Sequence, residues 1–369
     1  MKRTLVVIFG GRSGEHEISI RSARTVIQQA DREKYDVVPV MISEDGVWKS
    51  PEESWGAFGN PEDDRQASGD PGSGLLGLIA GILDGNEAKT GRGPSSSVVV
   101  FPVLHGTFGE DGTIQGLLEM ADVPYVGCGV LASSCGMDKV FMKTLFRDAG
   151  LPQCDYVWFL RDEWERAREA TVTRVAAKLR YPCFVKPANL GSSVGVSRAV
   201  DDDSLANAID LAAEYDRKII VEEGLDMREI ECAVMGNDAP EASLPGEYII
   251  RDSSKAFLDY TEKYSGTGNN EFVVPSPISD ELTVRVRSMA VKAFKAVDGS
   301  GLARVDFFLR SDNGALLINE INTMPGLTDA SGWPKMWQGT GKEFSVVIDE
   351  LVELALRRYE DKKRNRTSK

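Results

Sequence analysis

Apolar strand-like runs that alternate with helical stretches constrain the fold of this chain more than any other feature. Leu5–Phe9 is such a run. It ends in a glycine-rich loop, and a helical stretch follows from Glu15 to about Ala30. Val37–Ile42 and Val98–Leu104 are predicted as further strands, and Ile114–Met120 as a helix. Strands that alternate with helices pair in parallel, with the helices on the faces of the sheet. The N-terminal part is therefore predicted to be α/β with a parallel sheet.

The remainder of the chain mixes strands and helices less regularly. At 369 residues it is too long for one compact core, so two or three domains are expected. Residues 51–97 are rich in Gly, Pro, Ser and Asp, which predicts a partly flexible surface insertion with one short helix near Leu75–Leu83. Beyond it, an α+β arrangement is predicted. The strands expected there are Cys183–Lys186, Ile219–Glu222, Glu229–Val234, Glu247–Ile250, Ala303–Leu309 and Ala315–Ile321, and the helices are Ala132–Gly150, Arg166–Leu179, Leu205–Glu214, Asp280–Ala296 and Phe344–Tyr359.

Charge and cysteine content argue against several classes of protein. The chain has 43 Lys and Arg against 57 Asp and Glu, and a net charge of −14 argues against a nucleic-acid partner. No apolar run reaches the roughly 18 to 20 residues that span a bilayer, so we expect no membrane segment, and we expect no signal peptide. The five cysteines show no CxxC spacing, so a cytoplasmic protein with reduced, mostly buried thiols is expected. The two histidines leave little room for a His-rich metal site.

A loop of small residues, Asn189–Gly195, joins two predicted strands. Small residues let backbone N–H groups approach phosphate oxygens closely, although a hairpin without a ligand explains this loop equally well. Lys186 ends the strand before this loop, and Lys139 lies in the first turns of a predicted helix. A buried ammonium group needs a partner, which could be an anionic ligand or a carboxylate of the protein.

Acidic and amide side chains recur on two consecutive strands. Alternation places Arg304 and Asp306 on one face of the first strand, and Glu320 and Asn322 on one face of the next. Two carboxylates and an amide oxygen side by side suit Mg²⁺ that also holds nucleotide phosphates, and the lack of His and Cys argues against zinc. The alternative is a surface network of charged groups.

Three polar loops follow predicted strands. The segment Asn322–Thr328 contains a Pro-Gly turn whose backbone N–H groups could face a developing oxyanion, with Arg304 nearby. The segments His105–Thr113 and Gly10–Glu17 each follow a strand of the parallel sheet. Carboxyl ends of parallel strands are where α/β sheets bind ligands, so both loops are candidate binding segments.

Five segments in order resemble the D-alanine–D-alanine ligase family of the ATP-grasp superfamily. They are GGRSGEHEIS, HGTFGEDGTIQG, VKPANLGSSVGV, EKYSGTG and INEINTMPGLT, and the resemblance covers nearly the whole chain except 51–97 and the tail. It implies an ATP-grasp fold with an N-terminal parallel-sheet domain. The implied domains are an N-terminal substrate domain (1–127, with 51–97 as a flexible insertion), a central ATP-grasp domain with the Gly/Ser phosphate loop (128–225), and a C-terminal ATP-grasp domain with the metal and oxyanion residues (226–369).

The resemblance also implies roles for the substrate-side residues. Glu15 would hold the ammonium of the first D-alanine, with His105 close by, and Ser331 with the Gly332 backbone would bind the carboxylate of the second. The family usually has a larger residue where Gly332 stands. The implied catalytic residues are Glu15, Ser192, Tyr264, Arg304 and the Gly326 N–H, the last two as oxyanion donors.

The implied nucleotide site takes ATP with two Mg²⁺ ions, for which Mn²⁺ is an alternative. Lys139 and Lys186 would contact the α- and β-phosphates. Ser193 belongs to the loop that covers the phosphates. Glu222 and Leu225 would contact adenine, although Glu223 between them stands where the family often has Lys. Glu229 would bind the ribose. Lys263 lies with Tyr264 in a mobile loop, Ser253–Glu271, that would close over the γ-phosphate. The implied metal ligands are Asp306, Glu320 and Asn322.

The implied reaction joins two D-alanines at the expense of ATP through a D-alanyl phosphate, and supplies a peptidoglycan precursor. A homodimer is what the resemblance implies. Three alternatives remain open: a ligase that makes D-alanyl-D-lactate, an ATP-grasp enzyme for an unrelated acid and amine, and a non-catalytic nucleotide-binding module. Lys139, Lys186 and the three metal-site residues disfavour the last, and Glu15 together with Ser331 disfavours the second.

Overall fold

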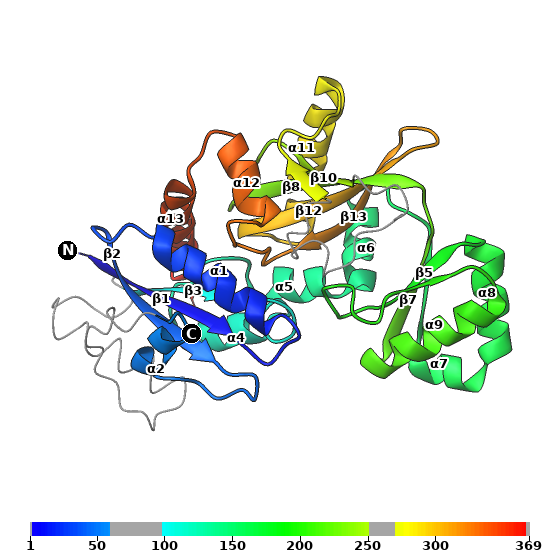
Figure 1. Ribbon diagram of the computed structural model, residues 1–369, viewed down its shortest axis with the longest axis horizontal. Coiled ribbons are helices and arrows are strands. Elements are labelled where there is room, and N and C mark those ends of the chain that lie inside the picture. Colours follow the sequence, from blue (N-terminus) through cyan, green and yellow to red (C-terminus); the bar gives the residue numbers. More distant parts are fainter. Residues whose placement is uncertain (1, 60–97, 251–269, 367–369) are drawn as a thin grey trace.

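The computed structural model describes residues 2–59, 98–250 and 270–366, drawn in colour in Figure 1. The helix expected near Leu75–Leu83 and most of the loop Ser253–Glu271 lie outside these residues. Three sheets follow one another along the chain. A parallel sheet lies at one end of the molecule, a six-stranded sheet lies in the middle, and a four-stranded sheet lies at the other end (Figure 1).

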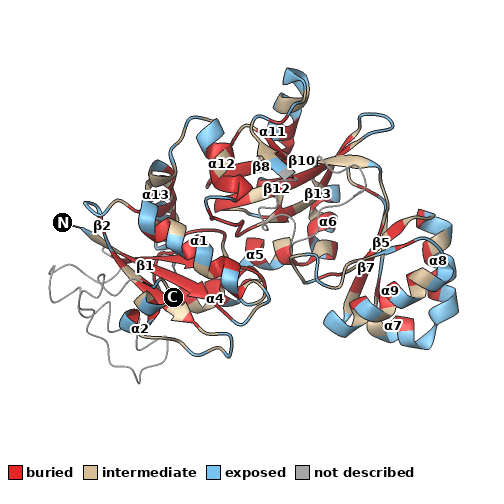
Figure 2. Cartoon of the chain, in the orientation of Figure 1, coloured by how far each residue is buried: buried red, intermediate tan, exposed pale blue. Residues whose placement is uncertain are grey.

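The N-terminal sheet is parallel, as predicted. It contains β1 (Arg3–Gly10), β2 (Tyr35–Ile42) and β3 (Val98–Val103) in the order β2-β1-β3. The central strand β1 is buried from Leu5 onward, as the red part of its ribbon in Figure 2 shows, and its neighbour β3 is buried throughout. The loops that follow β1 and β3 lead into α1 (His16–Gln29) and α4 (Thr113–Met120), and α2 (Pro51–Gly56) packs near β2. Both candidate binding loops therefore leave the same edge of the sheet.

The four-stranded sheet, formed by the middle part of the chain, is antiparallel in the order β4-β7-β5-β6. Its strands are β4 (Tyr156–Leu160), which the sequence did not reveal, β5 (Cys183–Pro187), β6 (Ser197–Ala199) and β7 (Lys218–Glu223). The helices α7 (Arg161–Arg166), α8 (Arg168–Leu179) and α9 (Asp202–Tyr215) accompany it and expose their outer faces (Figure 2). The loop Asn189–Gly195 thus joins two antiparallel strands, β5 and β6.

One helix predicted as continuous is divided in two. The stretch Ala132–Gly150 forms α5 (Val130–Met137) and α6 (Lys139–Asp148), because Asp138 leaves the helical conformation and accepts hydrogen bonds from the N–H groups at the start of α6, at 3.0 and 3.1 Å. An aspartate at this position is a favourable N-cap. The helix predicted over Arg166–Leu179 is present as α8, which begins two residues later because Ala167, with a ψ of 54°, separates it from α7. Lys139 therefore begins a helix rather than lying inside one.

The C-terminal sheet carries β11 (Asn270–Val273), β10 (Gly246–Ile250), β8 (Met227–Gly236), β12 (Gly301–Arg310) and β13 (Leu316–Asn322) in that order, with β9 (Glu241–Ala242) paired to β8. Helix α11 (Asp280–Ala296) packs against β8 and β12. The helices α12 (Gly332–Gly339) and α13 (Phe344–Lys362) follow, and α13 packs its buried side chains into the same core as β1 and β3. The C-terminal helix thus ties the end of the chain to the N-terminal sheet.

Candidate active site

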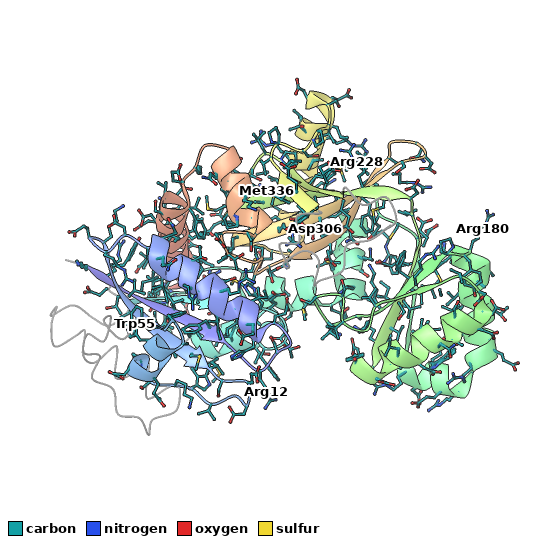
Figure 3. All side chains as sticks on the ribbon, in the orientation of Figure 1. Arg12, Trp55, Arg180, Arg228, Asp306 and Met336 are labelled. Carbon is teal, nitrogen blue, oxygen red and sulfur yellow. The ribbon has the colours of Figure 1, made fainter. Side chains whose placement is uncertain are left out.

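A small cavity of about 150 Å³ lies where loops from the three parts of the chain meet. Asp306, next to the wall of this cavity, lies near the middle of the molecule (Figure 3). Arg180 lies at the far end of the part that carries the four-stranded sheet (Figure 3). The predicted site residues that line the cavity are Glu15, His105, Lys139, Ser192, Ser193, Arg304, Glu320, Asn322 and Gly326. Side chains that are up to 311 positions apart in the sequence are therefore brought to one place.

Glu15 lies at the start of α1 and is held by hydrogen bonds from both near and distant parts of the chain. The Ser192 hydroxyl donates a hydrogen bond to the Glu15 carboxylate. This contact joins the N-terminal part to the loop Asn189–Gly195, the predicted phosphate loop. The Glu15 N–H donates to Ser13 Oγ at 3.1 Å, and that hydroxyl donates to the His105 carbonyl at 2.8 Å. Gly106 has a φ of +73°, and a Cβ there would lie 2.6 Å from Glu15 Oε2. Only glycine leaves the carboxylate its place.

His105 is buried beside Glu15 and contacts the turn that carries Gly326. Its Nδ1 lies 2.9 Å from the Met324 carbonyl oxygen, and its Nε2 lies 3.0 Å from Ser22 Oγ. Glu110 Oε1 lies 3.7 Å from Nδ1. Burial raises the pKa of Glu110, because a carboxylate loses its hydration there. Burial would lower the pKa of His105, but the Glu110 and Glu15 carboxylates outweigh it and raise that pKa.

The lysine cluster is organised around one buried carboxylate. Glu222, at the end of β7, receives Lys186 Nζ at 2.6 Å on one oxygen and Lys143 Nζ at 2.8 Å on the other. Lys139 Nζ donates to the Leu190 carbonyl at 2.7 Å, in the phosphate loop. Without a ligand, Lys186 therefore has the protein carboxylate partner that the sequence left open.

Charge compensation within this cluster shifts its pKa values. Burial would raise the pKa of Glu222, but the charges of Lys143 and Lys186 outweigh it and hold that pKa far below the ordinary value. Burial lowers the pKa of Lys139. Burial would also lower the pKa of Lys186, but Glu222 and Glu320 outweigh it and raise that pKa. The cluster therefore holds three ammonium groups, and the Glu222 carboxylate lies between those of Lys143 and Lys186.

Acidic side chains stand abreast on three neighbouring strands. Asp306 on β12 lies opposite Glu231 on β8 and opposite Glu320 on β13, and Arg304 lies opposite Asn322. Arg304 donates to both Asp306 oxygens at 2.7 Å, and its Nε lies 3.4 Å from Glu231 Oε2. The side-by-side placement inferred from alternation is what the register shows. A shift of register just after Asp306 re-aims the strands beyond the cluster.

The turn after β13 is held at several points. The Asn322 Oδ1 accepts the Met324 N–H at 3.0 Å. Ser331 Oγ accepts the Thr328 N–H at 3.1 Å and lies 2.7 Å from the Thr328 hydroxyl. Gly332 begins α12, and a Cβ there would lie 2.7 Å from the Phe272 ring. The space that a larger residue would use is thus filled by an aromatic ring from β11.

The other predicted site residues within the described ranges do not line the small cavity, except for Ser193. Leu225 lies two residues after the end of β7, and Glu229 lies on β8 opposite Phe308. Ser193 is exposed at the tip of the phosphate loop. Lys263 and Tyr264 lie outside the described residues.

Sequence reasoning missed four residues of the site. Lys143 is one helical turn beyond Lys139 on α6, a spacing that places both on one face. Glu231 is two residues beyond Glu229 on β8 and so points to the same face. Glu110 lies inside a polar loop that was already singled out. Ser22 has no signal in its neighbourhood beyond its position on the buried face of α1.

The residues present suit a hard divalent cation. Asp306, Glu320 and Asn322 offer only oxygen atoms, which fits Mg²⁺ or Mn²⁺ better than zinc. Among the described residues, no three His, Cys, Asp or Glu side chains gather as a complete metal site. Burial would raise the pKa of Glu320, but Lys139, Lys186 and Arg304 outweigh it and lower that pKa, so its carboxylate is charged and available. The set is typical of Mg²⁺ that shares its ligands with phosphates.

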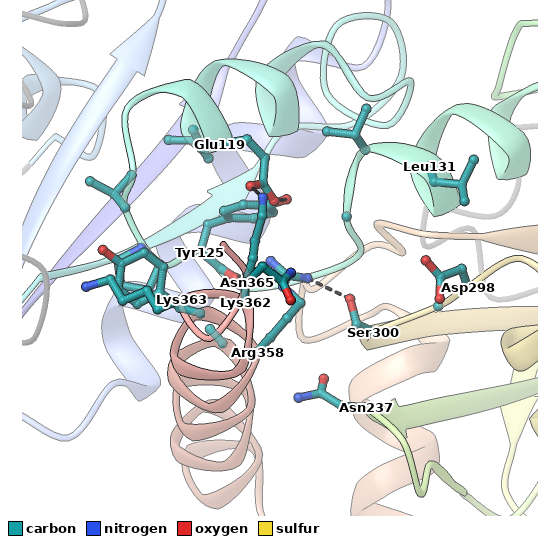
Figure 4. A pocket seen from close by; sticks show the side chains of 18 of the residues that line it. Glu119, Tyr125, Leu131, Asn237, Asp298, Ser300, Arg358, Lys362, Lys363 and Asn365 are labelled. Atoms are coloured by element: carbon teal, nitrogen blue, oxygen red, sulfur yellow. Dashed lines mark hydrogen bonds and ion pairs between the residues drawn. The ribbon is translucent and has the colours of Figure 1, made fainter. Parts of the chain in front are cut away.

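A larger cavity, of about 980 Å³, lies elsewhere, beside α13 (Figure 4). Two of its charged side chains have partners within its lining: Lys362 pairs with Glu119, and Arg358 donates to Ser300 Oγ at 2.6 Å. It contains none of the predicted site residues that the structure describes. Size therefore does not select the candidate active site here, and the convergent polar groups lie in the smaller cavity. No helix within residues 2–59, 98–250 and 270–366 has the length and apolarity to cross a membrane.

Comparison with known proteins gives the same family at every level. The family model described as D-ala D-ala ligase N-terminus matches residues 4–128, and that described as D-ala D-ala ligase C-terminus matches residues 145–353. The D-alanine–D-alanine ligase of Heliobacterium modesticaldum is 46% identical over 374 residues, which cover 100% of this chain and 99% of the relative. That of Bacillus licheniformis is 46% identical over 366 residues, which cover 98% of each.

Solved structures agree. The D-alanine-D-alanine ligase from Coxiella burnetii superposes with a TM-score of 0.76 at 33% identity and covers 98% of each chain. The VanG D-Ala:D-Ser ligase from Enterococcus faecalis superposes with a TM-score of 0.77 at 35% identity, over 96% of this chain and 100% of that one. The matched sequence models, the full-length relatives and the superposed folds lead to one conclusion: the chain belongs to the D-alanine–D-alanine ligase family and has the ATP-grasp fold with an N-terminal parallel-sheet domain.

Proposed function

We propose that this protein joins two D-alanine molecules in an ATP-dependent reaction that passes through D-alanyl phosphate, and so supplies the D-alanyl-D-alanine of peptidoglycan. One observation carries the proposal. A fixed carboxylate (Glu15), a guanidinium (Arg304) and an ammonium (Lys139) line one small cavity, and the charges of Lys186 and Glu222 act on Glu320 in its wall. An amino acid offers an ammonium and a carboxylate, and ATP offers phosphates, so each group has a complement.

The first D-alanine is held by its two charged ends. Glu15 takes the ammonium, and Ser192 with Gly106 keeps that carboxylate in place. Arg304 and the Gly326 N–H then face the carboxylate that attacks the γ-phosphate. The same donors stabilise the oxyanion that forms when the second amine attacks the acyl phosphate and phosphate leaves. Holding both reactants in one orientation lowers the entropic part of the barrier.

The nucleotide lies over the lysine cluster. Lys139 and Lys186 contact the α- and β-phosphates, the loop with Ser193 covers them, and Leu225 and Glu229 contact adenine and ribose. Glu222 contacts adenine from the strand end while its carboxylate keeps Lys186 in place. Lys263 and Tyr264 close over the γ-phosphate.

Two Mg²⁺ ions, or Mn²⁺ in their place, would be held by Asp306, Glu320 and Asn322, and they would offset charge on the phosphates. Glu320 would contribute a charged carboxylate with two oxygens as ligands. ATP with a divalent cation is general to the ATP-grasp ligases to which this chain belongs.

The second amino acid enters beside Ser331. Its carboxylate is held by the Ser331 hydroxyl and the Gly332 N–H at the start of α12. The VanG relative uses D-serine by its title, so D-serine joins D-lactate as a competing second substrate to be tested. We further propose a cytoplasmic homodimer, which the family resemblance supports.

Phosphate release from ATP across amino acids tests this function. We expect release that depends on D-alanine and on Mg²⁺, with little release with L-alanine, because with both charged ends held by Glu15 and Arg304 the methyl group of L-alanine would point in another direction. Release without an amino acid, or equal release with L-alanine, would contradict the proposal. Release with an unrelated acid and amine alone would favour another ATP-grasp activity.

A further inference from the structure

Ser22 and His105 connect the N-terminal part to the turn that carries Gly326. Ser22 is fully buried on α1, and His105 follows β3. The Leu327 N–H donates to Ser22 Oγ at 3.2 Å, Ser22 Oγ lies 3.0 Å from His105 Nε2, and His105 Nδ1 lies 2.9 Å from the Met324 carbonyl oxygen. The chain of contacts therefore leaves the turn at Leu327 and returns to it at Met324.

The chemistry of the end groups orients this chain. A carbonyl oxygen only accepts, so His105 Nδ1 must donate to Met324. In the neutral ring Nε2 then carries no hydrogen and accepts, so Ser22 Oγ takes the Leu327 N–H on a lone pair and donates its own hydrogen to Nε2. Each donor then has one acceptor, and Gly326 lies between the two anchored residues.

We propose that Ser22 is a positioning residue for the reaction, and that the Ser22–His105 bridge holds the Gly326 N–H at the place where the oxyanion forms. This inference rests on the proposed function. It also gives His105 a role that its nearness to Glu15 alone did not suggest: both ring nitrogens face the bridge rather than the substrate. The substrate-binding loops of the N-terminal part would thereby set the geometry of a donor that belongs to the C-terminal part.

The bridge has a matched control. Ser133 is a helical serine buried to the same extent, and its hydroxyl has no hydrogen-bond partner within the described part of the chain. Ser22→Ala and Ser133→Ala therefore each remove a hydroxyl oxygen from a fully buried position on a helix. We expect Ser22→Ala to lower kcat about tenfold or more and to leave the KM for ATP within about twofold, because the donor acts in the transition state. Ser133→Ala should change neither value.

Replacing His105 separates the two arms of the bridge. His105→Asn places an amide nitrogen near the position of Nδ1, so it keeps the donor to Met324 and loses the contact to Ser22. It should retain more activity than His105→Ala. Combined with Ser22→Ala, it should cost little more than Ser22→Ala alone, because both remove one connection. Multiplying effects would overturn the bridge, and thermal unfolding of each variant shows whether it folds.

Nitrogen-15 NMR of the imidazole rings gives a readout that does not depend on activity. The chain has two histidines, so His16→Gln assigns both. We expect hydrogen on His105 Nδ1, and an Nε2 resonance that moves in Ser22→Ala but not in Ser133→Ala. A neutral ring protonated at Nε2, or a resonance that Ser22→Ala leaves unchanged, would overturn the inference. An unaltered protein that releases no phosphate with D-alanine would instead overturn the proposed function, and the NMR result would still decide on the bridge.

Discussion

The proposed amino-acid side and the proposed nucleotide side of the candidate site are built by different means. Around Glu15 and His105 the contacts are hydrogen bonds among backbone groups, hydroxyls and one imidazole, and glycines give the carboxylate its space. Around Glu222 the contacts are ion pairs of a buried carboxylate with the buried Lys143 and the partly buried Lys186, with lysines in excess. The first side is arranged by shape and the second by charge.

The difference follows from what each ligand demands. A small amino acid is recognised by the exact spacing of two opposite charges and by its hand, which requires fixed geometry. Phosphates carry several charges, and a buried cationic cluster binds them while tolerating small displacements. Removal of charge should therefore be costly on the nucleotide side, and small changes of shape should be costly on the amino-acid side.

The largest effect is expected at the centre of the charge cluster. Glu222→Gln leaves Lys143 and Lys186 buried without their carboxylate, which should lower the free energy of unfolding by about 3 kcal/mol or more. Urea unfolding measures this. Glu223→Gln is the matched control. The Glu223 side chain is less buried than that of Glu222, and an amide oxygen at this position can still accept the Asp155 N–H. Equal stability of the two variants would remove the distinction between the two sides.

The same pair of proteins carries a pH signature. The pKa of Glu222 is lowered on folding, so its stabilising contribution is fully present above the ordinary glutamate pKa of about 4.3 and is lost as the pH falls toward the lowered value. The stability difference between the unaltered protein and Glu222→Gln should stay constant from pH 7 to pH 5 and shrink below about pH 4. A difference that grows on acidification would contradict the charge assignment.

The next effect concerns the metal ligands. Glu320→Gln keeps the shape and removes the charge, so turnover should fall by about two orders of magnitude or more. Asp312→Asn, at the exposed turn between β12 and β13, is the control and should leave turnover unchanged. Near-normal turnover of Glu320→Gln at saturating Mg²⁺ and ATP would sink the metal assignment.

A change of shape tests the other side. Gly106→Ala places a methyl group 2.6 Å from the Glu15 carboxylate and strains a backbone with φ of +73°, so the KM for D-alanine should rise about tenfold while the KM for ATP changes little. Gly314→Ala pays a similar backbone cost at φ +68° with open space around it, far from the site. If both variants bind D-alanine equally well, the side around Glu15 is not set by shape.

The smallest expected effect is at the loop residue Tyr264, where the prediction rests on the resemblance alone. Tyr264→Phe removes one hydroxyl, and a hydrogen bond is worth about 1 kcal/mol, so the use of D-lactate relative to D-alanine should rise about fivefold. Product ratios from a mixture of the two measure it. An unchanged ratio would mean that this hydroxyl does not select the second substrate.

The sequence revealed what repeats at short range and missed what depends on distant partners. Alternation placed Asp306 and Glu320 side by side on two neighbouring strands, and apolar runs located the parallel sheet. Both patterns depend only on residues that are close in the sequence. Asp138 was expected inside a helix, since nothing local distinguishes a helical aspartate from an N-cap that divides two helices.

Long-range contacts account for the missed residues. Lys143 acquires its place from Glu222, which is 79 positions later, and Ser22 from Leu327, which is 305 positions later. Gly332 appeared only as a missing side chain, and the ring of Phe272 that fills its space becomes known only from the folded chain. Charged and small residues are therefore assigned to a family pattern more readily than the residues that hold them.

Competition between second substrates tests the central claim most directly. The unaltered protein would be given ATP, Mg²⁺, D-alanine and equal amounts of D-lactate and D-serine at pH 7, and the products would be separated by mass. We predict D-alanyl-D-alanine as the main product, with one phosphate released for each dipeptide and little depsipeptide. Mainly D-alanyl-D-lactate or D-alanyl-D-serine would contradict the dipeptide assignment, and no condensed product would contradict the ligase activity itself.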